Sequence, residues 1–128
     1  MIICKLEDIK NTDRDVEWGN GHSYRFLLKK DGMGFTLTET TVEAGTSISI
    51  QYRNHVEACY CIEGEGEVEC NGVISPINKG TMYAPNMHEQ HFLRASKHSP
   101  LRLVCVFIPA LIGEEKHIVD GLLSPSSY

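Results

Sequence analysis

Glu57 and His91 carry side chains that can bind a metal ion, and each lies near glycines at a regular spacing. Glu57 is followed by the short apolar run 58–62 and then by the turn Glu-Gly-Glu-Gly, whereas His91 lies eleven residues after Gly80. A carboxylate and an imidazole that meet in a fold suit a divalent first-row ion such as iron, manganese or zinc. Two ligands alone make a weak site, so a third donor is needed.

The segment around Glu57 resembles the first sequence motif of the cupins. That motif reads G-x5-H-x-H-x3-4-E-x6-G, and this chain supplies its second half as Glu57, six residues and Gly64. The two histidines are missing, because Ile50 and Tyr52 or their neighbours stand where they should fall and His55 lies at the wrong spacing. The resemblance implies a cupin whose metal site has lost part of its usual histidine set.

The segment around His91 resembles the second cupin motif, G-x5-P-x-G-x2-H. Gly80 and His91 have its spacing, although Pro85 is one residue off and His88 replaces the second glycine. The resemblance implies that Glu57 and His91 are two of the four ligands expected in a cupin centre.

Tyr83 is a candidate for the third ligand. The strand expected at Thr81 to Ala84 runs toward the same barrel mouth, where a phenolate oxygen would complete a three-ligand site with positions left for substrate. On spacing alone, the better interpretation is an ordinary amphipathic tyrosine with a buried ring and a hydrogen-bonded hydroxyl.

Longer stretches of the chain resemble the ectoine synthases, and the similarity spans most of residues 1 to 121. The stretches are Lys30 to Phe35, Tyr60 to Gly66, Gly80 to Ala84, His91 to Ala95 and Arg102 to Phe107. Ectoine synthases are iron-dependent cupins that cyclise N-γ-acetyl-L-2,4-diaminobutyrate to the compatible solute ectoine with loss of water. The resemblance therefore implies a hydro-lyase of osmoprotectant biosynthesis, and it implies a homodimer.

The same resemblance implies roles for individual residues. The metal, with Fe²⁺ as the expected ion and other divalent first-row metals as alternatives, falls on Glu57, Tyr83 and His91. The implied catalytic residues are Glu115, Tyr52 and His55. The implied substrate-binding residues are Arg25, Thr40, Cys105 and Phe107, and we add Trp18 and His117 as further candidates for substrate binding.

Several of these residues also have simpler interpretations. Arg25 suits a bidentate grip on a carboxylate, but a strand arginine can equally be a solvated charge. Thr40 is either part of a hydroxyl-lined wall or an ordinary strand residue. Cys105 and Phe107 alternate along the last strand, so they point inward as core or as pocket.

His55 and Glu115 lie in segments where a simpler role is the common one. A histidine in a turn before a strand is more often a surface or hydrogen-bonding residue, and a charged loop such as 113–117 is usually solvated. If the tail covers the barrel mouth, we expect a drier site to raise the pKa of Glu115 toward a value useful for proton transfer.

One position departs from the family pattern. Where the family often has a tryptophan just after Gly-Asn, this chain has Gly21, and its single tryptophan is Trp18. Either Trp18 reaches the pocket by a different loop path, or the cavity is wider and prefers a related substrate.

Short β-type runs separated by Gly, Asn and Pro signals predict an all-β fold. The expected strands are Tyr24 to Leu28, Phe35 to Val42, Ser47 to Tyr52, Ala58 to Ile62, Glu65 to Cys70, Thr81 to Ala84, Gln90 to Leu93 and Leu101 to Phe107. Together with the resemblance, they predict a single cupin domain over 1–128, a jelly-roll barrel of two antiparallel sheets. We expect the barrel at about 24–108, a short helical turn near the start, and a tail at about 109–128 that covers the mouth.

Composition excludes several classes of protein. With 12 Lys and Arg against 17 Asp and Glu, the net charge of −5 disfavours nucleic acid as a partner. The chain shows no signal peptide and no apolar stretch of bilayer length, so we expect a cytoplasmic protein that binds no membrane. The five cysteines form no C-x-x-C pair, which favours a reducing compartment, and Cys59 and Cys61 are expected in the core.

Two other functions remain open on the sequence alone. The first is a cupin that binds a small ligand without turnover, and the second is a related cupin lyase with a shifted substrate. An iron oxygenase is less favoured, because such sites usually present several histidines.

Overall fold

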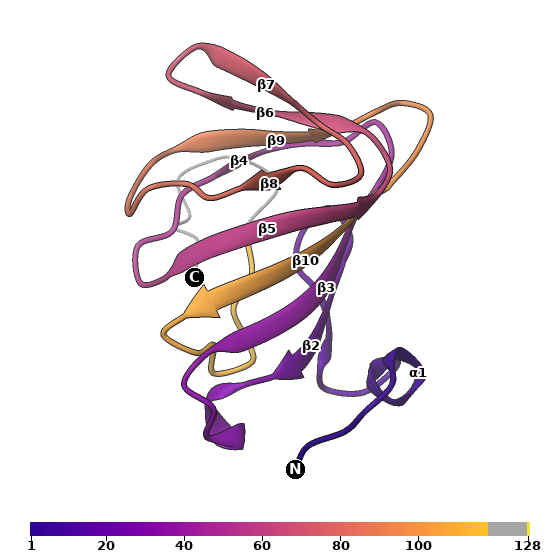
Figure 1. Cartoon of the computed structure of the whole chain (residues 1–128), viewed down its shortest axis with the longest axis vertical. Coiled ribbons are helices and arrows are strands. Elements are labelled where there is room, and N and C mark those ends of the chain that lie inside the picture. Colours follow the sequence, from indigo (N-terminus) through magenta and orange to yellow (C-terminus); the bar gives the residue numbers. More distant parts are fainter. Residues whose placement is uncertain (118–127) are drawn as a thin grey trace.

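The computed structural model describes residues 1–117 and Tyr128. These residues form ten strands, one short α-helix and one 3-10 helix (Figure 1). The elements in chain order are α1 (Leu6–Ile9), β1 (Asp15–Glu17), β2 (His22–Leu27), η1 (Lys29–Asp31), β3 (Thr36–Val42), β4 (Ser47–Ile50), β5 (Val56–Glu63), β6 (Gly66–Cys70), β7 (Val73–Ile77), β8 (Met82–Tyr83), β9 (His91–Ala95) and β10 (Leu101–Ile108). Among the described residues, no helix is long and apolar enough to cross a membrane.

The strands form two antiparallel sheets that face each other across the interior of the barrel (Figure 1). One sheet has six strands in the order β1-β2-β3-β10-β5-β8, and the other has four in the order β4-β9-β6-β7. In β10, Cys105 lies opposite Thr38 of β3 on one side and Cys59 of β5 on the other. This register brings inward-facing residues of three strands to one level of the barrel.

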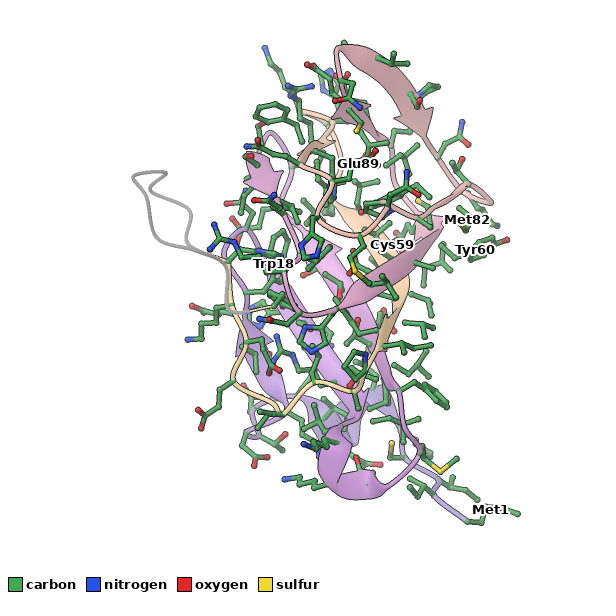
Figure 2. The ribbon with its side chains drawn as sticks, turned by 90° about the vertical axis from the view of Figure 1, so that its left-hand side faces the viewer. Met1, Trp18, Cys59, Tyr60, Met82 and Glu89 are labelled. Atoms are coloured by element: carbon green, nitrogen blue, oxygen red, sulfur yellow. The ribbon has the colours of Figure 1, made fainter. Side chains whose placement is uncertain are left out.

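Alternation along the two central strands separates the interior from the surface. The buried residues of β10 are Leu101, Leu103, Cys105 and Phe107. In β5, Cys59 and Cys61 are buried as predicted, whereas Tyr60 between them is exposed. Cys59 therefore points toward the interior while Tyr60 and Met82 lie on the outer face (Figure 2).

The predicted all-β fold with two antiparallel sheets and a short N-terminal helix is confirmed. Two strands, β1 and β7, were missed. The first has a single apolar residue, Val16, between two acidic ones, so it lacks a strand pattern. The second contains Pro76 and lies at a sheet edge, where a residue without an N–H is tolerated. The strand expected at 81–84 is limited to Met82–Tyr83.

The described part of the predicted tail packs against the barrel. Leu111 is fully buried, and its backbone N–H donates to Oγ1 of Thr36 at 2.8 Å. The backbone N–H of His117 donates to the carbonyl oxygen of Trp18 at 2.9 Å. Residues 118–127 of that tail lie outside the described residues.

Candidate active site

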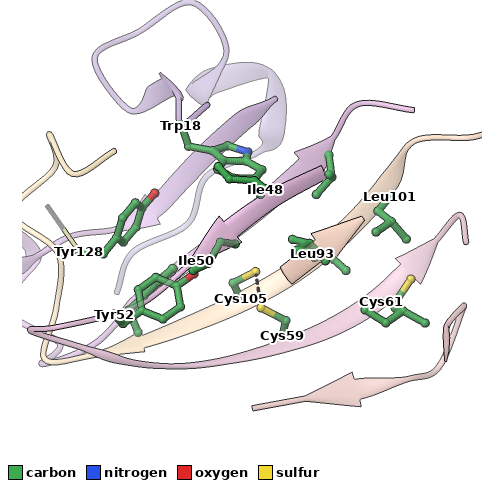
Figure 3. Close-up of a cluster of buried hydrophobic side chains, with 14 of the residues drawn as sticks. Trp18, Ile48, Ile50, Tyr52, Cys59, Cys61, Leu93, Leu101, Cys105 and Tyr128 are labelled. Carbon is green, nitrogen blue, oxygen red and sulfur yellow. Dashed lines mark hydrogen bonds between the residues drawn. The ribbon is translucent and has the colours of Figure 1, made fainter. Parts of the chain in front are cut away.

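A small cavity lies inside the barrel, with Cys59 and Cys105 in its wall. Figure 3 shows these two side chains together with Trp18, Tyr52 and Tyr128, which also line it. Its volume is about 20 Å³, room for about one water molecule. Its lining residues are Trp18, Thr40, Ile50, Tyr52, Glu57, Cys59, Tyr83, Leu93, Leu103, Cys105, Phe107, His117 and Tyr128. Most residues that the sequence marks as candidates therefore meet at one place.

Glu57, near the start of β5, is a buried carboxylate with no cationic partner in the described part of the chain. Its Oε1 accepts a hydrogen bond of 2.7 Å from the hydroxyl of Tyr52. Burial raises the pKa of Glu57 to about 7, although hydrogen bonds from Tyr52 and two cysteines act in the opposite direction. Among the described residues, no Lys or Arg forms an ion pair with it. A bound cation would stabilise the ionised carboxylate, which fits a metal ligand.

His91, at the start of β9, presents a free nitrogen lone pair. Its Nδ1 lies 3.2 Å from the backbone carbonyl oxygen of Glu89, which can only accept, so Nδ1 carries the proton. The other nitrogen, Nε2, is buried and has no hydrogen-bond partner among the described residues. Burial lowers the pKa of His91, so the ring is neutral near pH 7. A neutral imidazole held by a carbonyl on one side is the usual form of a metal-binding histidine.

Tyr83 completes a donor set that fits a divalent first-row ion. Its ring centroid lies 6.3 Å from that of His91, and burial raises its pKa well above the usual range. The phenol is therefore protonated in the absence of a cation. Glu57 and His91 are not hydrogen-bonded to each other, but Tyr52 lies next to both. The Tyr52 hydroxyl donates to Glu57, and the centroid of the Tyr52 ring lies 6.2 Å from that of the His91 ring. One carboxylate and one imidazole thus lie beside the Tyr52 ring, and the Tyr83 phenol lies beside the same imidazole.

Arg25 is completely buried, so the interpretation as a solvated strand charge is wrong. Its Nη2 donates to the backbone oxygen of Glu115 at 2.6 Å and to the hydroxyl of Tyr128 at 2.8 Å. Its Nη1 lies 3.7 Å from Oε1 of Glu115 and makes no hydrogen bond to any described residue. A buried guanidinium with an unsatisfied N–H group is suited to bind an anionic group.

Glu115 is buried as expected, but the expected rise in its pKa is wrong. Burial alone would raise the pKa, yet the backbone N–H groups of Gly113 and Ile112, followed by the charge of Arg25, lower it. Both N–H groups donate to the carboxylate at 2.8 Å. The carboxylate is therefore ionised at neutral pH, and it fixes the loop that carries it.

His117 and Tyr128 stack against each other at the cavity. Their ring centroids are 4.3 Å apart with an angle of 18° between the planes. Tyr128 also stacks on Phe107 at 5.4 Å and meets the edge of Tyr52 at 5.4 Å. Burial lowers the pKa of His117 to about 3, with the charges of His91 and Arg25 adding to the effect. The imidazole of His117 is thus neutral over the physiological range.

The structure places His55 and Glu115 outside the inner cavity. They line an open depression of about 690 Å³ together with Asn54, Pro109 and Ile112, among others. The buried Nδ1 of His55 has no hydrogen-bond partner among the described residues. Arg25 links the two spaces, because it bonds Glu115 of the depression and Tyr128 of the cavity.

The side chain of Trp18 lies in the cavity wall, and Trp18 and Gly21 both belong to the turn between β1 and β2. The indole Nε1 donates to the backbone oxygen of Thr41 at 2.9 Å, and the ring meets His117 edge-on at 5.6 Å. Gly21 has a φ of +156°, and a Cβ there would lie 2.1 Å from the same Thr41 oxygen. This backbone cannot hold a tryptophan at position 21, so Trp18 supplies the indole of the cavity wall.

Replacing Gly21 by alanine is therefore expected to lower the free energy of unfolding by about 3 kcal/mol, because backbone strain adds to a steric clash. Gly32 is a matched control. It also has a positive φ, +77°, but no atom lies within 4 Å of a Cβ built there. Gly32→Ala should lower the free energy of unfolding by only about 1 kcal/mol. Chemical denaturation measures the free energy of unfolding of both variants. An equal loss of stability in Gly21→Ala and Gly32→Ala would contradict the steric explanation.

Cys59 and Tyr128 line the cavity but were not predicted as site residues. For Cys59 a signal existed, since it lies two residues after Glu57 and therefore on the same strand face. The sequence around Tyr128 carries no comparable pattern, because its position depends on contacts with residues far away in the chain.

The barrel has the fold of the cupins. A Cupin 2 conserved barrel domain protein from Salinispora arenicola superposes with a TM-score of 0.66 at 15% identity, covering 84% of this chain and 88% of that chain. Identity this low shows the fold alone. The chain thus has a cupin fold, with a donor-lined cavity between its two sheets.

A model of the family described as ectoine synthase matches residues 1–127. An L-ectoine synthase from Desulfatibacillum aliphaticivorans is 52% identical over 125 residues, covering 94% of this chain and 95% of that protein. The crystal structure of ectoine synthase from P. lautus superposes with a TM-score of 0.82 at 53% identity, covering 88% of this chain and 81% of that chain. The chain belongs to the ectoine synthase family.

Proposed function

We propose that this chain is a hydro-lyase that closes N-γ-acetyl-L-2,4-diaminobutyrate into ectoine with loss of water. The observation that carries the proposal is the arrangement of the cavity in a chain of this family. A metal-type donor set, with Glu57 and Tyr83 in its wall, meets a buried aromatic cluster, and Arg25 bonds to Tyr128 of that cluster. Once the Tyr128 ring moves aside, the enlarged cavity would hold both ends of a short, flexible amino acid.

Arg25 would bind the carboxylate of the substrate, because it is the buried cation that bonds to a residue of the cavity wall. Its Nη1 has no hydrogen-bond partner among the described residues, and its Nη2 would exchange the bond to Tyr128 for one to the substrate, which gives the two parallel N–H groups that a carboxylate accepts. The aromatic rings of Trp18, Tyr52 and Phe107 would fold the remaining chain of the substrate so that its amine meets its acetamide carbon. Fixed geometry of this kind lowers the barrier by several kcal/mol.

Glu57, Tyr83 and His91 would hold the metal ion, which we propose to be Fe²⁺. When bound, such an ion acts as a Lewis acid toward a carbonyl oxygen and needs no change of oxidation state. The hydroxyl of Tyr52 would keep the Glu57 carboxylate in place through its hydrogen bond. The carbonyl of Glu89 would likewise hold His91 in the tautomer that leaves Nε2 free.

The proton transfers would use Glu115. In the ring closure the α-amine attacks the acetamide carbon, a C–N bond forms, and the carbinolamine then loses its hydroxyl as water while a C=N bond forms. The Glu115 carboxylate is ionised, so it can take a proton from the ammonium group and return it to the departing hydroxyl. Although its low pKa makes it a weak base, burial beside Arg25 would also lower the pKa of the substrate ammonium.

The test is anaerobic incubation of the iron-loaded protein with N-γ-acetyl-L-2,4-diaminobutyrate, followed by chromatography for ectoine. We expect ectoine to form without oxygen. A protein that binds iron and substrate but forms no product would contradict the proposal and would favour a ligand-binding cupin. Product formation that requires and consumes oxygen would instead identify an oxygenase.

Replacing Arg25 by glutamine should raise KM for the substrate about 10- to 100-fold, since a hydrogen bond to a charged group contributes about 1.5–3 kcal/mol. The matched control is Arg102→Gln, because Arg102 pairs with Glu39 and Glu63 on the outer face of the barrel. Steady-state kinetics of both variants decide the point. An unchanged KM in the folded Arg25→Gln variant would show that Arg25 does not bind the substrate.

Tyr128 occupies space that the substrate needs, because the cavity beside it holds only about one water molecule. Substrate binding must therefore displace the Tyr128 ring, which reduces the apparent affinity by the fraction of chains in the displaced state. We expect Tyr128→Ala to lower KM about three- to tenfold. A KM equal to or above that of the wild type would show that this ring does not compete with substrate.

We further propose that the enzyme works as a homodimer in the cytoplasm. All five cysteines are free thiols, which agrees with a reducing compartment. The outer face of β5 and β8 exposes Tyr60 and Met82 side by side, and these apolar side chains suit a contact between copies (Figure 2). Size-exclusion chromatography with light scattering measures the assembly directly.

A further inference from the structure

Three metal-binding atoms come together in the cavity wall apart from Tyr83 and His91. They are one carboxylate oxygen of Glu57 and the sulfur atoms of Cys59 and Cys105, and all three lie within 4.8 Å of one another. All three residues are buried. The sulfur atoms of the two cysteines are 3.3 Å apart (Figure 3).

The sheet fixes this arrangement. Cys59 and Cys105 lie directly opposite each other in the β5–β10 ladder, and Glu57 lies two residues before Cys59 on the same inward face. Both strands lie in the interior of the larger sheet. The three donors are therefore held by regular backbone rather than by a loop, which keeps a site preorganised.

The chemistry of this set differs from that of a carboxylate, a phenol and an imidazole. Thiolates select borderline and soft cations such as Zn²⁺, Cd²⁺ or Cu⁺. A Zn–S bond is about 2.3 Å long, so one ion can reach two sulfur atoms that are this close. Among the described residues, neither cysteine nor Glu57 has a cationic partner that would compete with an ion.

We propose that Glu57, Cys59 and Cys105 form a second cation site that takes a thiophilic divalent ion, Zn²⁺ in the cell. Binding replaces the two thiol protons, so one ion enters and two protons leave, with no oxidation. Because Glu57 belongs to both donor sets, an ion at the thiol site removes a ligand from the site of the proposed Fe²⁺. The thiol site thus gives thiophilic metals a way to displace the catalytic ion.

The test uses Cd²⁺, whose bonds to thiolates give a charge-transfer absorption that bonds to oxygen and nitrogen do not give. Because Cys4 is exposed and Cys70 partly exposed, both are first replaced by serine to remove adventitious binding. Cd²⁺ is titrated into this metal-free protein after reduction with a phosphine. We expect the absorption to saturate at one equivalent.

Cys59→Val in the same background should bind Cd²⁺ more than about 100-fold more weakly, since even outer-shell partners change metal affinity by about 10- to 100-fold. The matched control is Cys61→Val, because Cys61 is a buried thiol of the same strand that donates to the carbonyl of Glu63 instead. Cys59→Ala serves as a second variant, and near-ultraviolet circular dichroism reports the fold. A background protein without the absorption, or a Cys59 variant with undiminished absorption, would overturn the proposal.

Discussion

Replacing His91 by alanine should lower kcat for ring closure by about a thousandfold, while the protein stays folded. A metal acting as a Lewis acid supplies several kcal/mol of transition-state stabilisation, and each 1.36 kcal/mol corresponds to about a factor of ten in rate. His91 offers the free Nε2 lone pair, and alanine at this position leaves only the oxygen donors of Glu57 and Tyr83. Steady-state kinetics with metal analysis of the same sample measure the effect.

His98 provides the control for this substitution. It is an exposed histidine, so His98→Ala should keep full activity and full metal content. His91→Gln is a second variant that preserves more of the buried volume, and it should fail as His91→Ala does. A folded His91→Ala protein with more than a tenth of the wild-type kcat would mean that the reaction does not depend on this ligand.

Acid should destabilise the protein through His117. The pKa of this residue in the folded state is about 3, below the value of about 6.5 in an unfolded chain. Its contribution to stability is therefore complete above pH 6.5 and is lost as the pH falls toward 3. By linkage the loss between pH 7 and pH 4 is about 3 kcal/mol.

The variant His117→Phe keeps an aromatic ring beside Tyr128 and Trp18 but cannot take up a proton. Denaturant unfolding of metal-free protein at pH 7 and pH 4 should show that the variant loses about 3 kcal/mol less than the wild type. The exposed His98→Phe variant should behave as the wild type does. Equal acid sensitivity of the His117 variant and the wild type would show that this ring takes up its proton without loss of stability.

The sequence predicted the fold well because the strands of the core have a clear pattern. In β10, buried and half-buried residues alternate from Leu101 to Phe107, and this alternation is visible in the residue types. β1 and β7 had no such pattern, since the first is mostly acidic and the second is an exposed edge. Their positions follow from neighbouring strands, as the pairing of Val16 with Ser23 illustrates.

The site was predictable where it depends on strand register and not where it depends on long-range packing. Glu57, Cys105 and Phe107 face inward because of the alternation of their strands. The lowered pKa of Glu115 could not be foreseen, because it results from a loop conformation that directs two backbone N–H groups at the carboxylate. The hydrogen bond between Arg25 and the Tyr128 hydroxyl joins residues that are far apart in the chain. No local sequence pattern predicts such a contact.

The position of Trp18 in the cavity wall was predicted from the sequence only as one of two possibilities. The sequence left two possibilities for the missing tryptophan at position 21, and the structure places Trp18 in the wall. The reason is local, because the φ of Gly21 and the close Thr41 oxygen exclude a side chain at that position.

We propose above that a metal ion on Glu57, Tyr83 and His91 makes the cavity an active site for ring closure. The most direct measurement is an anaerobic titration of Fe²⁺ into metal-free protein, with bound iron and the rate of ectoine formation determined on each sample. We predict that the rate rises in proportion to bound iron and saturates at one ion per chain. Full activity in the metal-free protein would show that ring closure needs no metal ion at these residues.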